Sequence, residues 1–123
     1  MKTDYEFLKT EIDGHILTVT INRPERMNAL HPPAHAEFDE VWNEFDKDEN
    51  LWVGIVTGEG DRAFSAGNDL KFQAEAGGKM DINMASSGFA GLTSRFNLTK
   101  PLIAAVNGAV SYTHLTLPTT MWV

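Results

Sequence analysis

The 123-residue sequence contains no cysteine, which excludes a disulfide framework and a thiolate metal site. It also lacks any apolar run long enough to span a bilayer, so we expect no membrane partner. Residues 1–6 lack the apolar core of a secretory signal, and we therefore expect a cytoplasmic location, or an organelle matrix after processing. The remaining composition, 42% hydrophobic and 22% charged, is that of an ordinary soluble domain.

Basic residues are scarce as well, since 10 Lys and Arg stand against 17 Asp and Glu, for a net charge of -7. Binding to a nucleic-acid backbone needs a basic face, so we expect no nucleic-acid partner. A small phosphorylated ligand remains compatible if a few cations converge. Residues 110–123 contain no charged residue, so the whole net charge lies in residues 1–109.

Alternation of apolar residues with threonine, ending at Ile21, predicts a β-hairpin over residues 5–22. The pair Asp13-Gly14 is one that a tight two-residue turn favours. Pro24 cannot donate a hydrogen bond to a strand ladder, so the second strand should end before it.

A helix is predicted to begin at Pro32 or Pro33, because proline is tolerated in a first helical turn. Four apolar residues fall at i, i+3, i+4 and i+7: Phe38, Val41, Trp42 and Phe45. Acidic residues face outward between them: Glu37, Asp39, Glu40 and Glu44. This spacing predicts an amphipathic helix that buries its aromatic side.

Two short apolar runs predict strands: residues 51–60 a strand buried on both faces, and residues 101–108 a second buried strand. Between them, residues 61–77 predict a loop that enters a helix near Asp69, and residues 89–98 predict a further helix. Strands that alternate with helices indicate an α/β fold with at least one parallel strand pair.

The stretch "AFSAGNDL" carries the clearest chemical signal, because small residues join a strand exit to a helix start. Backbone N–H groups there lack intrahelical partners and can point at an anion. One interpretation is an arm of an oxyanion hole, with the Ala66 N–H as a donor. The alternative is an N-cap formed by Asn68 or Asp69 on a surface helix, which is the commoner arrangement.

The other polar residues give weaker signals. Arg23 and Arg26 bracket a proline turn and suit a ligand phosphate, although this segment alone favours two solvated arginines that balance local glutamates. His31 and His35 have the i, i+4 spacing of metal ligands, but no third ligand is evident, so we expect solvated or capping histidines and no metal site. Ser65 has no obvious base partner, so we predict no serine nucleophile.

Three blocks, "VTINRPERMNAL", "VGIVTGEGDRAFSAGNDL" and "KPLIAAVNG", together resemble the enoyl-CoA hydratase/isomerase (crotonase) family, from Tyr5 to about Gly108. The resemblance implies a crotonase-like ββα spiral, truncated here, with residues 1–109 forming its N-terminal part. It also implies an acyl-CoA thioester substrate, a homotrimeric or hexameric parent protein, and no separate cofactor, since coenzyme A is part of the substrate. The expected chemistry is stabilisation of a thioester enolate by an oxyanion hole.

The resemblance also implies the residues of the site. The residue matching Ala66 supplies one oxyanion-hole N–H, and the rest of that substrate-binding loop matches Gly67, Asn68 and Asp69. Arg26 and Ala29 match the segment that lies along coenzyme A. The phrase "GFAGLT" is similar to one in the crotonobetainyl-CoA hydratase type, but that type tends to have an aromatic residue in place of Asn68. The choice among hydratase, isomerase and crotonobetainyl-CoA hydratase therefore stays open.

After "AAVNG" the family continues into a glycine-rich turn and its catalytic glutamates, whereas this chain continues as "AVSYTHLTLPT". The codons GTC TCT TAT ACA CAT CTG ACG CTG CCG ACG, from an end adapter of transposase-based sequencing libraries, encode "VSYTHLTLPT". We therefore interpret residues 110–123 as a translated sequencing adapter; a divergent natural C-terminus is the alternative. The chain itself is expected to be an inactive fragment without the catalytic glutamates, or else a non-catalytic CoA-binding or subunit-binding short protein.

Overall fold

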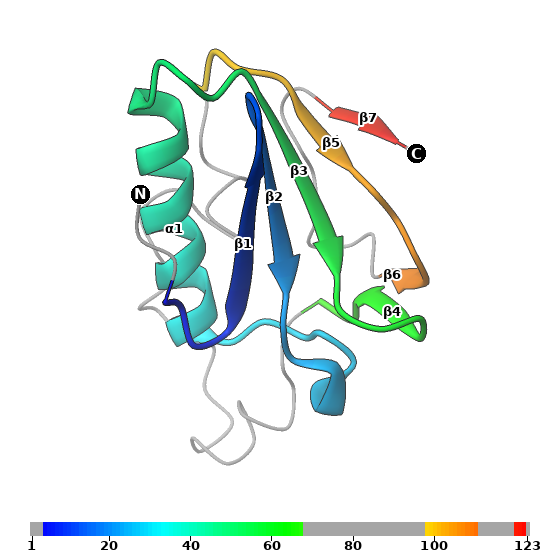
Figure 1. Ribbon diagram of the computed structural model, residues 1–123. Helices are drawn as coiled ribbons and strands as arrows, with labels where there is room; N and C mark the ends of the chain where they lie inside the picture. The colour runs from blue at the N-terminus through cyan, green and yellow to red at the C-terminus, as the bar shows by residue number, and fades with distance from the viewer. Residues whose placement is uncertain (1–3, 68–97, 111–119, 123) are drawn as a thin grey trace.

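The computed structural model of the chain describes residues 4–67, 98–110 and 120–122. In these ranges a five-stranded sheet, in the order β1-β2-β3-β5-β7, carries a helix on one face, and a two-stranded sheet of β4 and β6 lies beside it (Figure 1). No helix in these ranges is long and apolar enough to cross a membrane.

The first two strands form the predicted hairpin. Strands β1 (Leu8–Asp13) and β2 (Ile16–Ile21) pair antiparallel, with Asp13 opposite Ile16. The turn residues are therefore Gly14 and His15, one position later than the predicted Asp13-Gly14 pair. Gly14 has φ of 61°, which glycine adopts without the steric cost that a side chain would bring.

The parallel pairing that defines the α/β class is confirmed. Strand β3 (Val53–Gly58) lies parallel to β2, and β5 (Leu102–Ala104) lies parallel to β3. Strand β7 (Thr120–Trp122) continues the sheet beyond β5. Pairing of this kind uses only backbone N–H and C=O groups, so it does not bear on the origin of the tail residues.

A short strand was missed in the region predicted to be a loop. Strand β4 (Ala63–Ser65) pairs parallel with β6 (Ala109–Val110), with an irregular register. All three residues of β4 are buried, and a strand this short shows no alternation that a sequence pattern could reveal. It carries the chain directly to Ala66.

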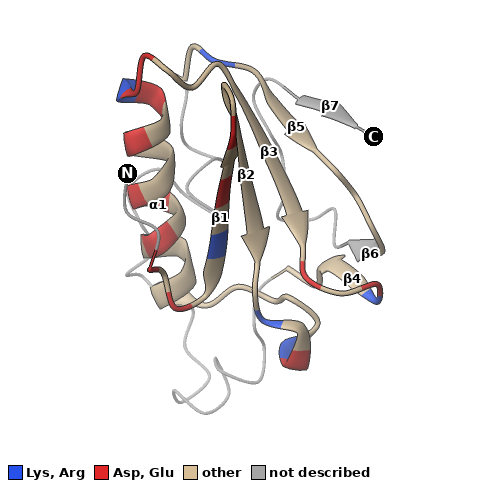
Figure 2. Ribbon diagram, viewed as in Figure 1, with Lys and Arg blue, Asp and Glu red and all other residues tan. Residues whose placement is uncertain are grey.

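Helix α1 (Pro32–Lys47) confirms the predicted helix and its inward face. The residues predicted to face the core are fully buried: Phe38, Val41, Trp42 and Phe45. They pack on sheet residues that include Leu17, Val19, Val56 and Leu102. Acidic residues, red in Figure 2, recur along α1; of those predicted to face outward, Glu40 is exposed and Glu37, Asp39 and Glu44 are half-buried. Full burial of each large apolar side chain stabilises the fold by roughly 1.5–3 kcal/mol.

The prediction that β3 is buried on both faces is wrong. Gly54, Val56 and Gly58 are buried, whereas Val53 and Ile55 on the other face are only half-buried. In the described part of the chain α1 is the one α-helix, and it covers one face of the sheet (Figure 1). The helices predicted to start near Asp69 and to span residues 89–98 lie outside the described residues.

Hydrogen bonds join the C-terminal end of α1 to Lys100, which lies just before β5. Lys100 Nζ donates to the carbonyl oxygens of Phe45 and Asp48, at 2.6 Å each. It also lies 5.0 Å from the centroid of the Phe45 ring. These two oxygens also accept hydrogen bonds from the backbone N–H groups of Asp48 and Leu51, and the added cation opposes the negative end of the helix dipole.

Candidate functional site

Two segments that the sequence assigned to one ligand lie side by side. The Ala66 N–H donates to the Met27 carbonyl oxygen at 3.0 Å, and the Leu30 N–H donates to the Gly67 carbonyl oxygen at 2.7 Å. Met27 follows the 3₁₀ turn η1 (Pro24–Arg26) and has φ of 55°. The structure thus joins the turn after β2 to the loop after β4.

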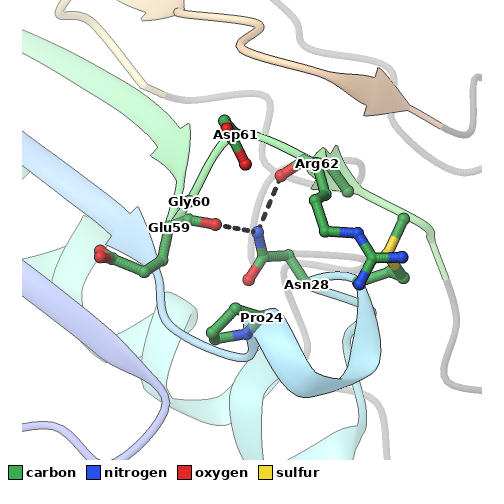
Figure 3. Close-up of a pocket in the computed structure, with 8 residues that line it drawn as sticks. Pro24, Asn28, Glu59, Gly60, Asp61 and Arg62 are labelled. Atoms are coloured by element: carbon green, nitrogen blue, oxygen red, sulfur yellow. Dashed lines mark hydrogen bonds between the residues drawn. The ribbon is translucent and has the colours of Figure 1, made fainter.

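Asn28 is the centre of this junction and is 1% exposed. Its Oδ1 accepts from the Arg23 N–H at 3.0 Å. Its Nδ2 donates to the carbonyl oxygens of Glu59, at 3.0 Å, and Ala63, at 2.8 Å (Figure 3). A side-chain amide has two N–H donors, so both are used, and the turn is anchored to the β3–β4 connection.

Ser65 links the same two segments from the other side and is 2% exposed. Its Oγ donates to the Asn28 carbonyl oxygen at 3.0 Å and accepts from the Gly67 N–H at 3.2 Å. The sequence offered Ser65 only as a nucleophile without a base. In the structure its hydroxyl is used in both directions, which makes it part of the scaffold of the loop.

Ala66 itself is exposed, but its N–H is already bonded to Met27. For this N–H to reach a ligand carbonyl, it would have to share or leave the Met27 oxygen. Asn68 and Asp69, the other members of the predicted loop, lie outside the described residues. The assignment of the Ala66 N–H as the oxyanion-hole donor, and of Asn68 and Asp69 to the substrate-binding loop, stays a prediction.

The remaining predicted site residues lie in or beside the junction. Gly67 is buried with φ of 87°, a conformation that favours glycine. Ala29 is 5% exposed, and its carbonyl oxygen accepts from Arg23 Nη1 at 2.6 Å. Arg26 is half-buried at the end of η1. Arg26 and Ala29 lie on the segment after β2, and Gly67 lies on the loop after β4, which the Leu30–Gly67 hydrogen bond joins to it.

The interpretation of Arg23 as a solvated arginine is wrong, and its interpretation as a phosphate ligand stays a prediction. It is 5% exposed, and its Cζ lies 5.7 Å from the centroid of the Phe7 ring. A guanidinium whose side chain is buried against a carbonyl and an aromatic ring holds the turn in place.

The histidine predictions also need correction. His31 and His35 are 6% and 2% exposed, so neither is solvated. His31 occupies the N-cap position of α1 without a side-chain capping hydrogen bond, and its ring packs edge-on against Phe7 at 4.4 Å. Among the described residues no group of three or more His, Asp or Glu side chains is arranged to hold a metal ion.

A cavity of about 90 Å³ opens beside the junction, between η1 and the β3–β4 connection (Figure 3). It is lined by Pro24, Met27, Asn28, Glu59, Gly60, Asp61, Arg62 and Ala63. Pockets that enclose a whole ligand usually measure about 300–1,000 Å³, so this cavity fits only part of an extended molecule.

Arg62 is a candidate binding residue that the sequence reasoning missed. It is exposed at the cavity, directly before β4. The carboxylate of Glu59, which also lines the cavity, is paired with Lys9 at 3.0 Å. In the sequence, the one indication of a binding role for Arg62 is its position immediately before "AFSAG". The fold shows that Arg62 borders the same cavity as Met27.

The profile of one protein family, described as enoyl-CoA hydratase/isomerase, matches residues 11–113. The chain is 48% identical over 103 residues to carnitinyl-CoA dehydratase of Escherichia coli strain K12, an alignment that covers 84% of this chain and 39% of that enzyme. The chain therefore spans about 39% of the length of that curated relative.

Solved structures give the same result. The structure of a carnitinyl-CoA hydratase from Mycobacterium avium is similar with a TM-score of 0.73 at 34% identity, covering 83% of this chain and 39% of that one. An enoyl-CoA hydratase from Mycobacterium tuberculosis H37Rv gives a TM-score of 0.70 at 36% identity, covering 83% and 38%. The expected crotonase-like α/β fold is confirmed for the matched part.

Proposed function

The chain belongs to the enoyl-CoA hydratase/isomerase family, and we propose that it forms the acyl-CoA-binding part of an enzyme that hydrates or isomerises an enoyl-CoA. One observation carries the proposal: the loop that begins at Ala66 is hydrogen-bonded to the turn that contains Arg26 and Ala29. A ligand that extends along the turn would place its thioester near the loop. The two predicted binding segments then act as one surface.

The chemistry assigned to the loop is stabilisation of negative charge. Hydration or isomerisation of an enoyl thioester passes through an enolate, and each fixed N–H donor can lower that barrier by about 3–4 kcal/mol. The Ala66 N–H is engaged with Met27, so it serves only if that bond is shared or released.

The cavity beside η1 is the proposed contact for an outer part of coenzyme A. Arg62 lines it, and Arg26 ends the turn that forms its other wall. A guanidinium binds phosphate oxygens in bidentate geometry, which suits the charged end of the molecule. The net charge of -7 makes such local cations necessary for an anionic ligand.

The similarity to carnitinyl-CoA dehydratase favours a substrate of that class. Dehydration of a β-hydroxyacyl thioester and hydration of the matching enoyl thioester are the two directions of one reaction. We therefore propose crotonobetainyl-CoA and crotonyl-CoA as the two substrates to compare. The assembled enzyme is proposed to be a homotrimer or a pair of trimers.

The proposed activity belongs to a protein that continues beyond Gly108, with residues 110–123 derived from adapter DNA. Support comes from the match of residues 110–119 to adapter codons and from the share of the relatives that the chain spans. Reading the source DNA through the codon for Gly108 tests this. A continuation into glycines and a glutamate supports it, and genomic DNA that encodes "VSYTHLTLPT" contradicts it.

The activity is tested by comparing the 123-residue chain with the product of that longer reading frame. We expect the longer protein to hydrate one of the two enoyl-CoA substrates and the chain alone to turn over neither. Turnover by the chain alone would contradict its assignment as a fragment. Saturable CoA binding by both without turnover by either would favour the alternative, a non-catalytic CoA-binding protein.

A further inference from the structure

Buried polar side chains gather where the two binding segments meet. Among the described residues, the buried polar or charged side chains are Arg23, Asn28, His31, His35 and Ser65. Arg23, Asn28 and Ser65 belong to one connected network with the backbone of residues 27–30 and 65–67. Burial of polar groups costs free energy unless they are hydrogen-bonded, so the hydrogen bonds of Asn28 and Ser65 favour one backbone arrangement here.

We propose that Ser65, anchored by Asn28, is a positioning residue that sets the direction of the backbone at Ala66 and Gly67. This inference rests on the proposed function, because it concerns the loop assigned to the thioester. Ser65 is not proposed to touch a reacting atom. It acts through the N–H groups that follow it.

The geometry of Ser65 explains how it would do this. Its Oγ accepts from the N–H of Gly67, two residues later, and this local bond turns the chain immediately after β4. Gly67 completes the turn with its φ of 87°. The bend at Ala66 and Gly67 is therefore held by one hydroxyl.

The other end of the Ser65 link is held in place. Ser65 Oγ donates to the Asn28 carbonyl oxygen, and the Asn28 side chain makes three hydrogen bonds to Arg23, Glu59 and Ala63. The carbonyl oxygen of a residue tethered in this way has little freedom to move. The loop thus takes its position from the β3–β4 connection through Asn28 and Ser65.

This arrangement predicts a specific kinetic effect. Displacement of a catalytic donor by about 1 Å can cost about 100-fold in rate. Replacement of Ser65 by alanine removes both hydroxyl bonds but leaves the turn at Pro24–Arg26 in place. We expect kcat to fall about tenfold to 100-fold, with KM changed less than threefold.

Three variants separate positioning from simple stability. Ser65→Ala removes the hydroxyl, Ser65→Thr keeps it, and Ser65→Cys keeps the volume while weakening both bonds. The matched control is Thr57→Val, which removes a half-buried hydroxyl that donates to the Ala105 carbonyl oxygen at 2.9 Å. Kinetics are measured on the longer protein and amide exchange on the 123-residue chain.

The expected kinetic result is a fall in kcat for Ser65→Ala, a smaller fall for Ser65→Cys, and near-complete recovery in Ser65→Thr. Thr57→Val should keep kcat within twofold. An unchanged kcat in Ser65→Ala, or an equal fall in Thr57→Val, would overturn the proposal.

Amide exchange tests the positioning role of Ser65 independently of activity. If the longer protein turns over no acyl-CoA, the proposed function is contradicted, but the exchange result still tests Ser65. In Ser65→Ala the amides of Ala66 and Gly67 should exchange at least about tenfold faster, a loss near 1.4 kcal/mol of local protection, while Val56 is unchanged. Unchanged exchange at Ala66 and Gly67 would show that Ser65 does not position the loop.

Discussion

The layer between α1 and the sheet and the network under the candidate site are both buried, but they are held by different forces. In the first, which we term the apolar layer, Phe38, Trp42 and Phe45 of α1 are each 0% exposed against apolar strands. In the second, the polar network, Asn28 and Ser65 are 1% and 2% exposed and are fixed by hydrogen bonds. The apolar layer stabilises the fold in proportion to its area, whereas the polar network fixes directions.

The largest expected effect tests the apolar layer with two tryptophans. Trp42→Ala removes a fully buried indole and should lower the free energy of unfolding by about 3–5 kcal/mol, through lost burial and a cavity. Trp52 is 58% exposed and stacks on His15 at 3.6 Å, so Trp52→Ala should cost about 0.5–1 kcal/mol. Urea denaturation of both variants measures the difference, and equal losses would contradict the described burial.

The second prediction tests the polar network with two asparagines. Asn28→Gly leaves the Arg23 N–H and two carbonyl oxygens without their partner, and glycine adopts φ of 55° freely. We expect a loss of about 2–4 kcal/mol, most of it from the missing amide. Asn107 also donates twice, to the Gly58 and Gly60 carbonyl oxygens at 2.7 Å each, but it is exposed.

For Asn107→Gly, water can replace both hydrogen bonds, and the expected loss is about 1 kcal/mol, mostly from backbone entropy. The same denaturation measurement compares the two variants. If Asn107→Gly cost as much as Asn28→Gly, burial would not be what makes the network important.

These two predictions also mark what the sequence could reveal. The inward face of α1 is visible because Phe38, Val41, Trp42 and Phe45 repeat with the period of a helix. In such a repeat, the position of a residue alone predicts whether its side chain is buried. The hairpin and the parallel α/β order were predictable for the same reason, apart from a one-residue shift of the turn.

The polar network has no such period. The Asn28 amide binds carbonyl oxygens 31 and 35 residues away, and Ser65 binds one 37 residues away. No local sequence pattern can predict hydrogen bonds between residues so far apart. Arg23 looked like a solvated residue because a sequence does not show that Phe7 and the Ala29 carbonyl oxygen enclose it. The family resemblance located the site segments, but the hydrogen bonds that join them required the fold.

The third prediction concerns the cation at the end of the apolar layer. Lys100→Met keeps the length of the side chain and its contact with Phe45, but removes the charge that binds two terminal carbonyl oxygens of α1. We expect a loss of about 1–2 kcal/mol in the free energy of unfolding. Lys47→Met, at an exposed residue of the last helical turn, should cost less than about 0.5 kcal/mol.

The smallest effect is a pH dependence at the edge of the apolar layer. Burial, together with the carboxylates of Glu44 and Glu40, raises the pKa of Tyr5 well above its ordinary value. Above about pH 10 the unfolded chain loses this proton while the folded chain keeps it, so stability falls as pH rises. We expect the Tyr5 contribution to be about 1 kcal/mol smaller at pH 11 than at pH 9.

Tyr5→Phe provides the control for that dependence. Phenylalanine does not titrate, so the variant should lose less stability than the original chain between pH 9 and pH 11. Thermal unfolding at several pH values measures both slopes, and parallel curves would show that Tyr5 does not contribute.

The most direct test of the shared binding surface is a titration of the 123-residue chain with coenzyme A, followed by backbone amide chemical shifts. We expect saturable shifts at Met27, Ala29, Ala66 and Gly67 together, with Trp52 unaffected. The shared binding surface would be contradicted by shifts confined to one of the two segments, by shifts centred elsewhere, or by a folded chain whose spectrum coenzyme A leaves unchanged.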